Sequence, residues 1–322
     1  MNMNLNMKKT TLSLAIAALL PAFANAEKVE VELPEFYGKI NVSVQNTQEE
    51  GKGSISEVVS NASRLGVKGK IELNHGLQGI YQAEYEMSVD EGNKGSSTDK
   101  KTFSQRNTFA GIKGGFGQVI VGNFDTPLKK AQKKIDLFND LEGDIKSVIS
   151  ASDKRTKNTT QYNTPKMAGL VATVANISSE VDGGKDGLSS SLTFSKDKFY
   201  AAAAYDSDVR AEDVNVIRLV AQYSIADITL GALWESEDGD ASSENDGWIA
   251  SAAYKATSDV TLKAQYGQSD IVEDEAKTYS LGADYKLAKN AKVFAFVTNE
   301  DYDDSGVNVT NDYYAVGTEF KF

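Results

Sequence analysis

The sequence predicts an all-β protein, a sixteen-stranded antiparallel β-barrel that crosses a membrane. Two observations carry this prediction. Apolar and polar residues alternate over segments of about ten residues, which is typical of strands and matches one tilted passage through a bilayer. Tight turns and long polar loops also alternate along the chain, and an even number of strands can close without an unpaired edge in hydrocarbon.

The alternation is clearest near the two ends of the chain, in residues 36–45, 276–287 and 311–322. In 276–287, for example, Tyr279, Leu281 and Tyr285 alternate with polar residues such as Ser280 and Asp284. The predicted strands are 35–45, 61–73, 77–88, 103–113, 116–124, 157–164, 169–178, 187–195, 198–206, 213–225, 227–237, 246–256, 259–269, 276–287, 290–301 and 311–322. The fourth, fifth and fifteenth of these alternate poorly.

The connections between these strands predict two unlike ends of the sheet. Short turns such as 74–76, 114–115 and 288–289 mark one end. The other end carries the polar loops 46–60, 89–102, 125–156, 179–186, 207–212, 238–245, 270–275 and 302–310. Short periplasmic turns and long extracellular loops are typical of outer-membrane barrels. Two soluble β-sandwiches remain the alternative, with the apolar face of each strand buried inside.

The N-terminus predicts a bacterial secretory signal peptide over residues 1–26. Lys8 and Lys9 form a basic region, 10–20 is apolar, Pro21 follows, and 24–26 (ANA) is a small-residue cleavage site. The barrel domain is then 27–322. Removing two lysines and no acid changes the net charge from −12 to −14, because −12 − 2 = −14.

Composition argues against several other classes of function. The chain has 34 basic and 46 acidic residues, so a nucleic-acid partner is not expected. It has no Cys and a single His, His75, which lies in a predicted turn, so we expect neither an enzyme nor a cofactor. The mature charge of −14 predicts a weak preference for cations if the barrel is a channel.

The longest connection, 125–156, predicts a structured loop with a short helix. Thr126 is suited to cap a helix and Pro127 to begin it. Leu128, Ala131 and Ile135 then follow helical spacing. A loop this long in a compact domain is usually functional, although a surface lid is the alternative to an inward-folded segment.

Four segments and the closing residue resemble one known family. They are FYGKINVSVQ (36–45), SRLGVKGKIEL (63–73), FAGIKGGFGQVIVGNFDTP (109–127), RTKNTTQYNTPKMAGL (155–170) and the terminal Phe322. Together with the signal peptide they look like a Gram-negative general diffusion porin. The resemblance implies a sixteen-stranded outer-membrane barrel, usually a homotrimer, that passes small hydrophilic solutes and ions by passive diffusion.

The resemblance also implies a constriction, where basic residues on the wall face acids on the third extracellular loop. Matching the motifs position by position gives a basic wall of Lys39, Arg64, Arg106 and Arg155. The acid candidates on the loop are Asp136, Asp140, Glu142 and Asp144. The loop lacks the family's usual Pro-Glu-Phe-Gly-like stretch and carries four lysines at 129, 130, 133 and 134, which leaves the selectivity open.

The sequence also predicts further partners and leaves one alternative function open. Phe322 matches the terminal signal that the outer-membrane assembly machinery reads in this family. The acidic loops 238–245 and 270–275 suggest contact with outer-membrane lipids and lipopolysaccharide through divalent cations. The rival is a barrel that acts mainly as an adhesin or phage receptor, with little flux.

One further motif weakly resembles a calcium-binding loop. Asp301, Asp303, Ser305 and Asp312 have nearly the required spacing, but the twelfth position carries Asp in place of the usual Glu. The flanking segments also read as strands instead of helices. An acidic extracellular loop is the simpler interpretation, and no metal site is expected.

Overall fold

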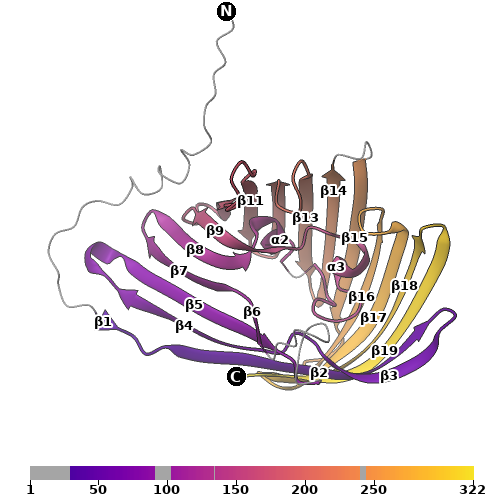
Figure 1. Cartoon of the computed structure of the whole chain (residues 1–322). Coiled ribbons are helices and arrows are strands. Elements are labelled where there is room, and N and C mark those ends of the chain that lie inside the picture. Colours follow the sequence, from indigo (N-terminus) through magenta and orange to yellow (C-terminus); the bar gives the residue numbers. More distant parts are fainter. Residues whose placement is uncertain (1–29, 91–102, 134, 240–243) are drawn as a thin grey trace, which may run out of the picture.

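The chain folds into one continuous antiparallel sheet that closes on itself as a barrel (Figure 1). The computed structural model describes residues 30–90, 103–133, 135–239 and 244–322. The predicted signal peptide lies outside these residues. The first strands are β1 (Glu30–Val31), β2 (Glu35–Glu49), β3 (Gly53–Ser60), β4 (Arg64–Glu72), β5 (Gln78–Met87), β6 (Phe103–Gln105), β7 (Thr108–Gly114), β8 (Gly117–Asp125), β9 (Arg155–Asn163) and β10 (Leu170–Ile177).

The second half of the sheet has long, regular hairpins. Its strands are β11 (Gly187–Lys196), β12 (Phe199–Ser207), β13 (Asn215–Ile225), β14 (Ile228–Asp238), β15 (Glu244–Lys255), β16 (Val260–Ser269), β17 (Asp274–Ala288), β18 (Ala291–Asp304) and β19 (Val307–Lys321). The helices are the 3-10 turn η1 (Asn74–Gly76), α2 (Pro127–Ala131) and α3 (Ile145–Val148). No helix in the described part is long and apolar enough to cross a membrane.

These segments make sixteen barrel strands, as the sequence predicts. β2 pairs with both β3 and β4, so those two segments form one interrupted strand, and β5 pairs in the same way with β6 and β7. The short β1 pairs with β4 just beyond the residues of β4 that pair with β2, so it continues β2 and adds no separate strand to the ring. The predicted strand 103–113 is therefore present but broken at Arg106 and Asn107.

The barrel closes where the last strand meets the first long one. β19 pairs with β2 from Asn311 opposite Glu49 to Lys321 opposite Lys39. The terminal Phe322 extends this pairing, because its N–H donates to Gly38 O at 3.1 Å and its carbonyl accepts from Gly38 N at 2.9 Å. A Cβ at Gly38 would lie 2.3 Å from the Phe322 ring, so glycine leaves the room that this ring occupies.

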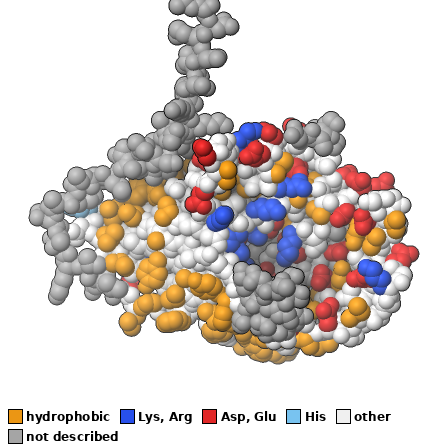
Figure 2. Space-filling model, viewed as in Figure 1, with side chains coloured by type: hydrophobic (Ala, Val, Ile, Leu, Met, Phe, Trp, Pro, Cys, Tyr) orange, Lys and Arg blue, Asp and Glu red, His pale blue; other side chains and the backbone are white. Residues whose placement is uncertain are grey.

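The polarity of the barrel is the reverse of that in a soluble protein. Large apolar side chains on the outer face are exposed, among them Val316 at 65%, Leu281 at 56% and Leu219 at 47%. Their polar neighbours along the strands, such as Ser280 and Arg218, are buried on the inner face. Figure 2 shows hydrophobic side chains along the outer wall and basic side chains around a central hollow. This arrangement contradicts the soluble sandwich and is expected for strands that face lipid.

Most aromatic residues near strand ends are exposed, as expected for rings at headgroup depth. Trp234 pairs with Trp248 toward the loop end, and Phe199 pairs with Tyr223 toward the turn end. Two aromatic residues near strand ends point inward instead. Phe124 is fully buried, and Tyr37 donates its hydroxyl to Glu84 at 3.1 Å. Both therefore belong to the inner wall. An aromatic residue near a strand end can lie on either face of the barrel.

Two predicted loops are largely strands. Residues 46–60 contain the ends of β2 and β3, joined by a tight turn at 50–52, and 302–310 contains a hairpin that turns at Ser305 and Gly306. These extensions carry polar residues on both faces. Beyond the hydrocarbon neither face meets lipid, so the period-two signal fades although the backbone pairing continues.

Candidate functional site

The connection between β8 and β9, residues 126–154, lies against the inner wall of the barrel and organises the site. As predicted, Thr126 caps α2, because its hydroxyl accepts the N–H of Lys129 at 3.1 Å, and Pro127 begins the helix. A second short helix, α3, begins after Asp144, which the sequence did not reveal. Figure 1 shows both helices within the curve of the sheet.

The side of this loop that lies against the inner wall is apolar and buried. Leu128, Ala131, Ile135, Ile145 and Ile149 are fully buried against the inner faces of β12–β15. The wall offers small side chains there, including Ala202 and Ala204. This explains the apolar run 199–205, where one face meets lipid and the other meets the loop. Phe138 packs separately against Phe294 and Phe296. Apolar burial therefore seats the loop over one half of the wall.

A buried arginine joins both ends of the loop to the wall. Arg218 on β13 has no exposed surface, and its guanidinium pairs with Glu235 on the neighbouring strand at 2.5 Å. It also donates to Asp153 at 3.1 Å, Ser150 Oγ at 2.8 Å and the carbonyl of Leu128 at 3.3 Å. Leu128 belongs to the start of the loop, and the other two belong to its end. We call these five residues the Arg218 latch.

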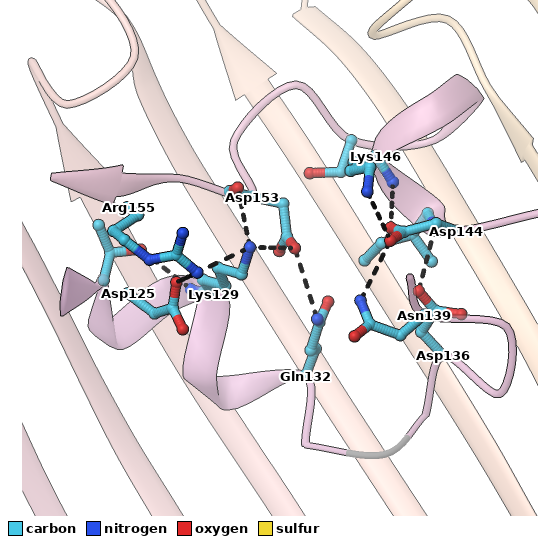
Figure 3. Close-up of polar contacts among 12 residues, drawn as sticks. Asp125, Lys129, Gln132, Asp136, Asn139, Asp144, Lys146, Asp153 and Arg155 are labelled. Carbon is cyan, nitrogen blue, oxygen red and sulfur yellow. Dashed lines mark hydrogen bonds and ion pairs between the residues drawn. The ribbon is translucent and has the colours of Figure 1, made fainter. Parts of the chain in front are cut away.

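Contacts between residues of the loop also hold it together. Lys129 Nζ lies 3.2 Å from Asp153, so the first helix contacts the final residues of the loop (Figure 3). Asp144 accepts from Asn139 at 3.2 Å and from Lys146 Nζ at 3.0 Å. These contacts hold the loop in one compact shape.

The tip of the loop reaches the opposite wall through Asp140. One of its carboxylate oxygens lies 2.8 Å from Lys39 Nζ and 3.0 Å from the Arg64 guanidinium. Burial acts to raise the pKa of Asp140, but the charges of Lys39 and Arg64 outweigh it and lower that pKa to about 2. Two predicted wall residues and one predicted loop acid are thus brought together.

The other two predicted basic residues lie further along the same wall, each with an acid. Arg106 Nε lies 3.1 Å from Glu84, and its guanidinium also contacts Glu86. Arg155 lies 2.9 Å from Asp125. The inner wall therefore supplies its own carboxylates to these arginines, and the loop acids do not reach them.

The remaining loop acids divide into two kinds. Asp136 is 6% exposed and accepts the N–H groups of Phe138 and Ile145 at 2.9 and 3.1 Å. Asp144 is 1% exposed and caps α3, with Lys146 N at 3.1 Å. Both carboxylates are engaged in shaping the loop. Glu142 instead faces the wall and accepts from Gln45 at 3.3 Å.

A cavity of about 730 Å³ opens beside these residues, between the loop and the wall formed by β4–β9. Among the described residues, seven basic and six acidic side chains line it. The loop contributes four of the bases, Lys129, Lys130, Lys133 and Lys146, and the wall contributes the arginines. Lys134 lies outside the described residues. Charges of opposite sign on facing walls create a field across such a space.

The weak calcium motif forms a β-hairpin. Asp301 and Asp303 lie on β18, Ser305 lies in the turn, and Asp312 lies on β19 opposite Asn299, which donates to it at 2.9 Å. Asn299 is four residues from Asp303 on β18. Asp312, which lies opposite Asn299, is therefore roughly 13 Å from Asp303 along the strands. No group of three or more potential metal ligands occurs in the part of the chain that the structure describes.

Sequence reasoning missed Glu84, Glu86 and the Arg218 latch. The two glutamates alternate with Ala83 and Tyr85, so the period of β5 already placed them on the inner face. Arg218 stands within the apolar run VIRLV, where an isolated arginine indicates a buried partner. Its partners are 65 and 90 residues away along the chain in Asp153 and Leu128, which local pattern does not reveal.

Comparison with known proteins gives a consistent picture. A family model described as Gram-negative porin matches residues 12–305. The major outer membrane protein P.IB of Neisseria meningitidis serogroup B is 26% identical over 340 residues, covering 98% of this chain and 89% of that protein. In other matched relatives, such as the same protein of Neisseria gonorrhoeae, the chain spans about half the length, 47%.

Solved structures share the fold at low sequence identity. An anion-selective porin from Comamonas acidovorans has a TM-score of 0.74 at 17% identity and covers 92% of this chain and 100% of its own. The outer-membrane protein OmpT of Vibrio cholerae, described in a trimer form, has a TM-score of 0.67 at 16% identity, with 90% and 99% covered.

Replacing Arg218 by Ala should release the loop while the barrel stays folded. The change leaves Glu235 buried without its counter-charge, a loss that typically costs about 3–5 kcal/mol, and leaves Asp153 with Lys129. Hydrogen exchange should accelerate in 126–154 and stay slow in β13–β18. The matched control is Arg210→Ala, since Arg210 lies in a loop, its side chain is 34% exposed, and among the described residues it pairs with Glu237 alone. Equal protection of the loop in both variants would contradict the latch.

The Asp140 contact should survive mild acid. Its folded pKa of about 2 lies below the ordinary value of 3.8, so its stabilising effect is complete above the ordinary value and disappears as the pH falls toward 2. Carbon-detected NMR of labelled aspartate should show Asp140 ionised at pH 3.5 and, in Lys39→Met, titrating at higher pH. An Asp140 that titrates at or above pH 4 in the unmodified protein would refute the contact.

Proposed function

Because this chain belongs to the Gram-negative porin family and forms an outer-membrane β-barrel, we propose that it is a passive, water-filled channel for small hydrophilic solutes and ions. The observation that supports this most directly is the charged cavity between the loop and the inner wall. A barrel of sixteen strands is wide enough to leave an aqueous lumen. No step in this transport needs a cofactor or an energy source.

The loop provides the constriction of the channel. Its apolar underside and the Arg218 latch fix one side to β12–β15, and the pairing of Asp140 with Lys39 and Arg64 fixes its tip. The open path then runs past Arg106 and Arg155 on the wall and past the loop lysines. Ordered charges on the two sides orient water and polar solutes, which favours hydrophilic solutes over apolar ones.

The charges at the constriction favour a different selectivity from the one that total charge predicts. Without the predicted signal peptide the chain carries −14, but the described side chains that line the cavity are seven bases and six acids, a balance of +1. Asp140 is also shared by two cations. Since selectivity depends on the narrowest point, we propose weak anion preference in place of the weak cation preference expected from composition.

We also propose that three copies assemble. A Vibrio cholerae neighbour of the same fold is described in a trimer form. On β7 and β8, the outward residues Ala110, Ile112, Val119 and Val121 pair across the strands and give a small, apolar surface. Such a surface suits close contact between barrels within the membrane.

Planar-bilayer recording tests the channel. The purified protein should give ohmic steps, closing in threes if it is trimeric, and liposomes that contain it should swell in small sugars. A barrel that acts as an adhesin or receptor with little flux would give neither result. In Arg64→Ala the conductance should rise, by roughly tens of percent, because a long side chain leaves the constriction while Lys39 still holds Asp140.

The control for this variant is Lys185→Ala. Lys185 lies in an extracellular loop and pairs with Asp213, outside the cavity, so its removal should leave conductance unchanged. If Arg64→Ala and Lys185→Ala conduct alike, Arg64 does not lie at the narrowest point. Both variants should melt at the temperature of the unmodified protein within a few degrees, which separates pore effects from unfolding.

A further inference from the structure

The basic wall of the constriction continues toward the end of the barrel that carries the short turns. Lys321 on β19 lies directly opposite Lys39 on β2, and Lys39 lies opposite Arg64 on β4. On the neighbouring strands Lys286 lies directly opposite Lys292. Residues opposite each other in antiparallel strands point to the same face, so these cations form a row along the inner wall.

Like charges at that spacing repel unless an anion lies between them. Along most of the row, a carboxylate of the protein itself lies between the cations. Asp140 contacts Lys39 and Arg64, while Glu319 lies 2.8 Å from Lys321 and 3.9 Å from Lys39. Asp284 joins Lys292 to Lys263 at 2.9 and 3.0 Å.

The row ends at a cavity of about 720 Å³ that is lined by the turns 256–259 and 288–291 and the strand ends beside them. Lys255, Lys286 and Lys289 line this cavity, and within the described residues none of them has an ion-pair partner. Its lining holds five lysines and four acids, and two of those acids, Asp284 and Glu319, are already shared by cations of the row. Asp227 and Asp259 complete the acidic set.

We propose that this turn-side cavity is a binding site for a small soluble anion that carries phosphate or carboxylate oxygens. The anion binds between Lys255, Lys286 and Lys289. It has the role that carboxylates of the protein have between the cations nearer the constriction. The site lies on the inner face and in line with the constriction, so an anion in transit reaches it at the periplasmic end of the path. This inference rests on the proposed channel and adds to it a second, lower point of anion contact.

The test uses inorganic phosphate as the probe. In planar bilayers of neutral phosphatidylcholine, phosphate on the turn side should reduce chloride current at lower concentration than phosphate on the loop side. In Lys286→Gln/Lys289→Gln the half-blocking concentration on the turn side should rise at least about threefold, since two of the three unpaired positive charges of the site are removed. The value on the loop side should stay unchanged.

The matched control is Lys166→Gln/Lys198→Gln, which removes two exposed lysines from other short turns that do not line this cavity. It should behave as the unmodified protein. Equal block from both sides, an equal effect of both double variants, or an effect that requires anionic lipid would overturn the proposal.

Calorimetric titration of the detergent-solubilised protein with phosphate separates this inference from the channel itself. Loss of phosphate binding in Lys286→Gln/Lys289→Gln supports the site even if no current is seen. Normal current in the unmodified protein without phosphate binding leaves the channel intact and removes the site.

Discussion

The absence of water from the hydrocarbon core of a bilayer is the constraint on which this structure depends. Every backbone N–H and C=O at that depth needs a partner within the protein, so the sheet has to close. Here closure is made by β19 and β2 and is completed by Phe322 against Gly38. Closure turns alternate side chains toward lipid and the others toward an enclosed space, and the charges needed for a hydrophilic path can be kept only there.

The enclosed space sets a second requirement, because a loop that lies inside it has to be held without a conventional core. The chain uses an apolar seat on β12–β15 and a buried arginine that contacts both ends of the loop. A buried ion pair adds little net stability, since desolvation offsets most of its attraction. What the buried arginine contributes is a specific geometry. Its guanidinium donates to Glu235, Asp153 and Ser150 together in one arrangement of the loop.

Much of this architecture could be predicted from the sequence because strand period reports which face meets lipid. Lys39 and Arg64 fall on the polar face and do meet Asp140. Asp136 and Asp144 have the same residue type as Asp140, but they accept backbone N–H groups within the loop, and local sequence does not separate these roles. The Arg218 latch joins residues distant in the chain, and the strands beyond the membrane in 46–60 lose their alternation.

The inverted polarity of the wall can be measured on two adjacent residues, because the chain has no cysteine of its own. Thr261 lines the turn-side cavity, and Leu262 is 45% exposed on the outer face. In liposomes, Thr261→Cys should react quickly with a charged, water-soluble thiol reagent. Leu262→Cys should resist it, and a fluorophore attached there before reconstitution should be quenched by brominated lipid. Equal reactivity at both positions, or quenching at 261 alone, would contradict the account.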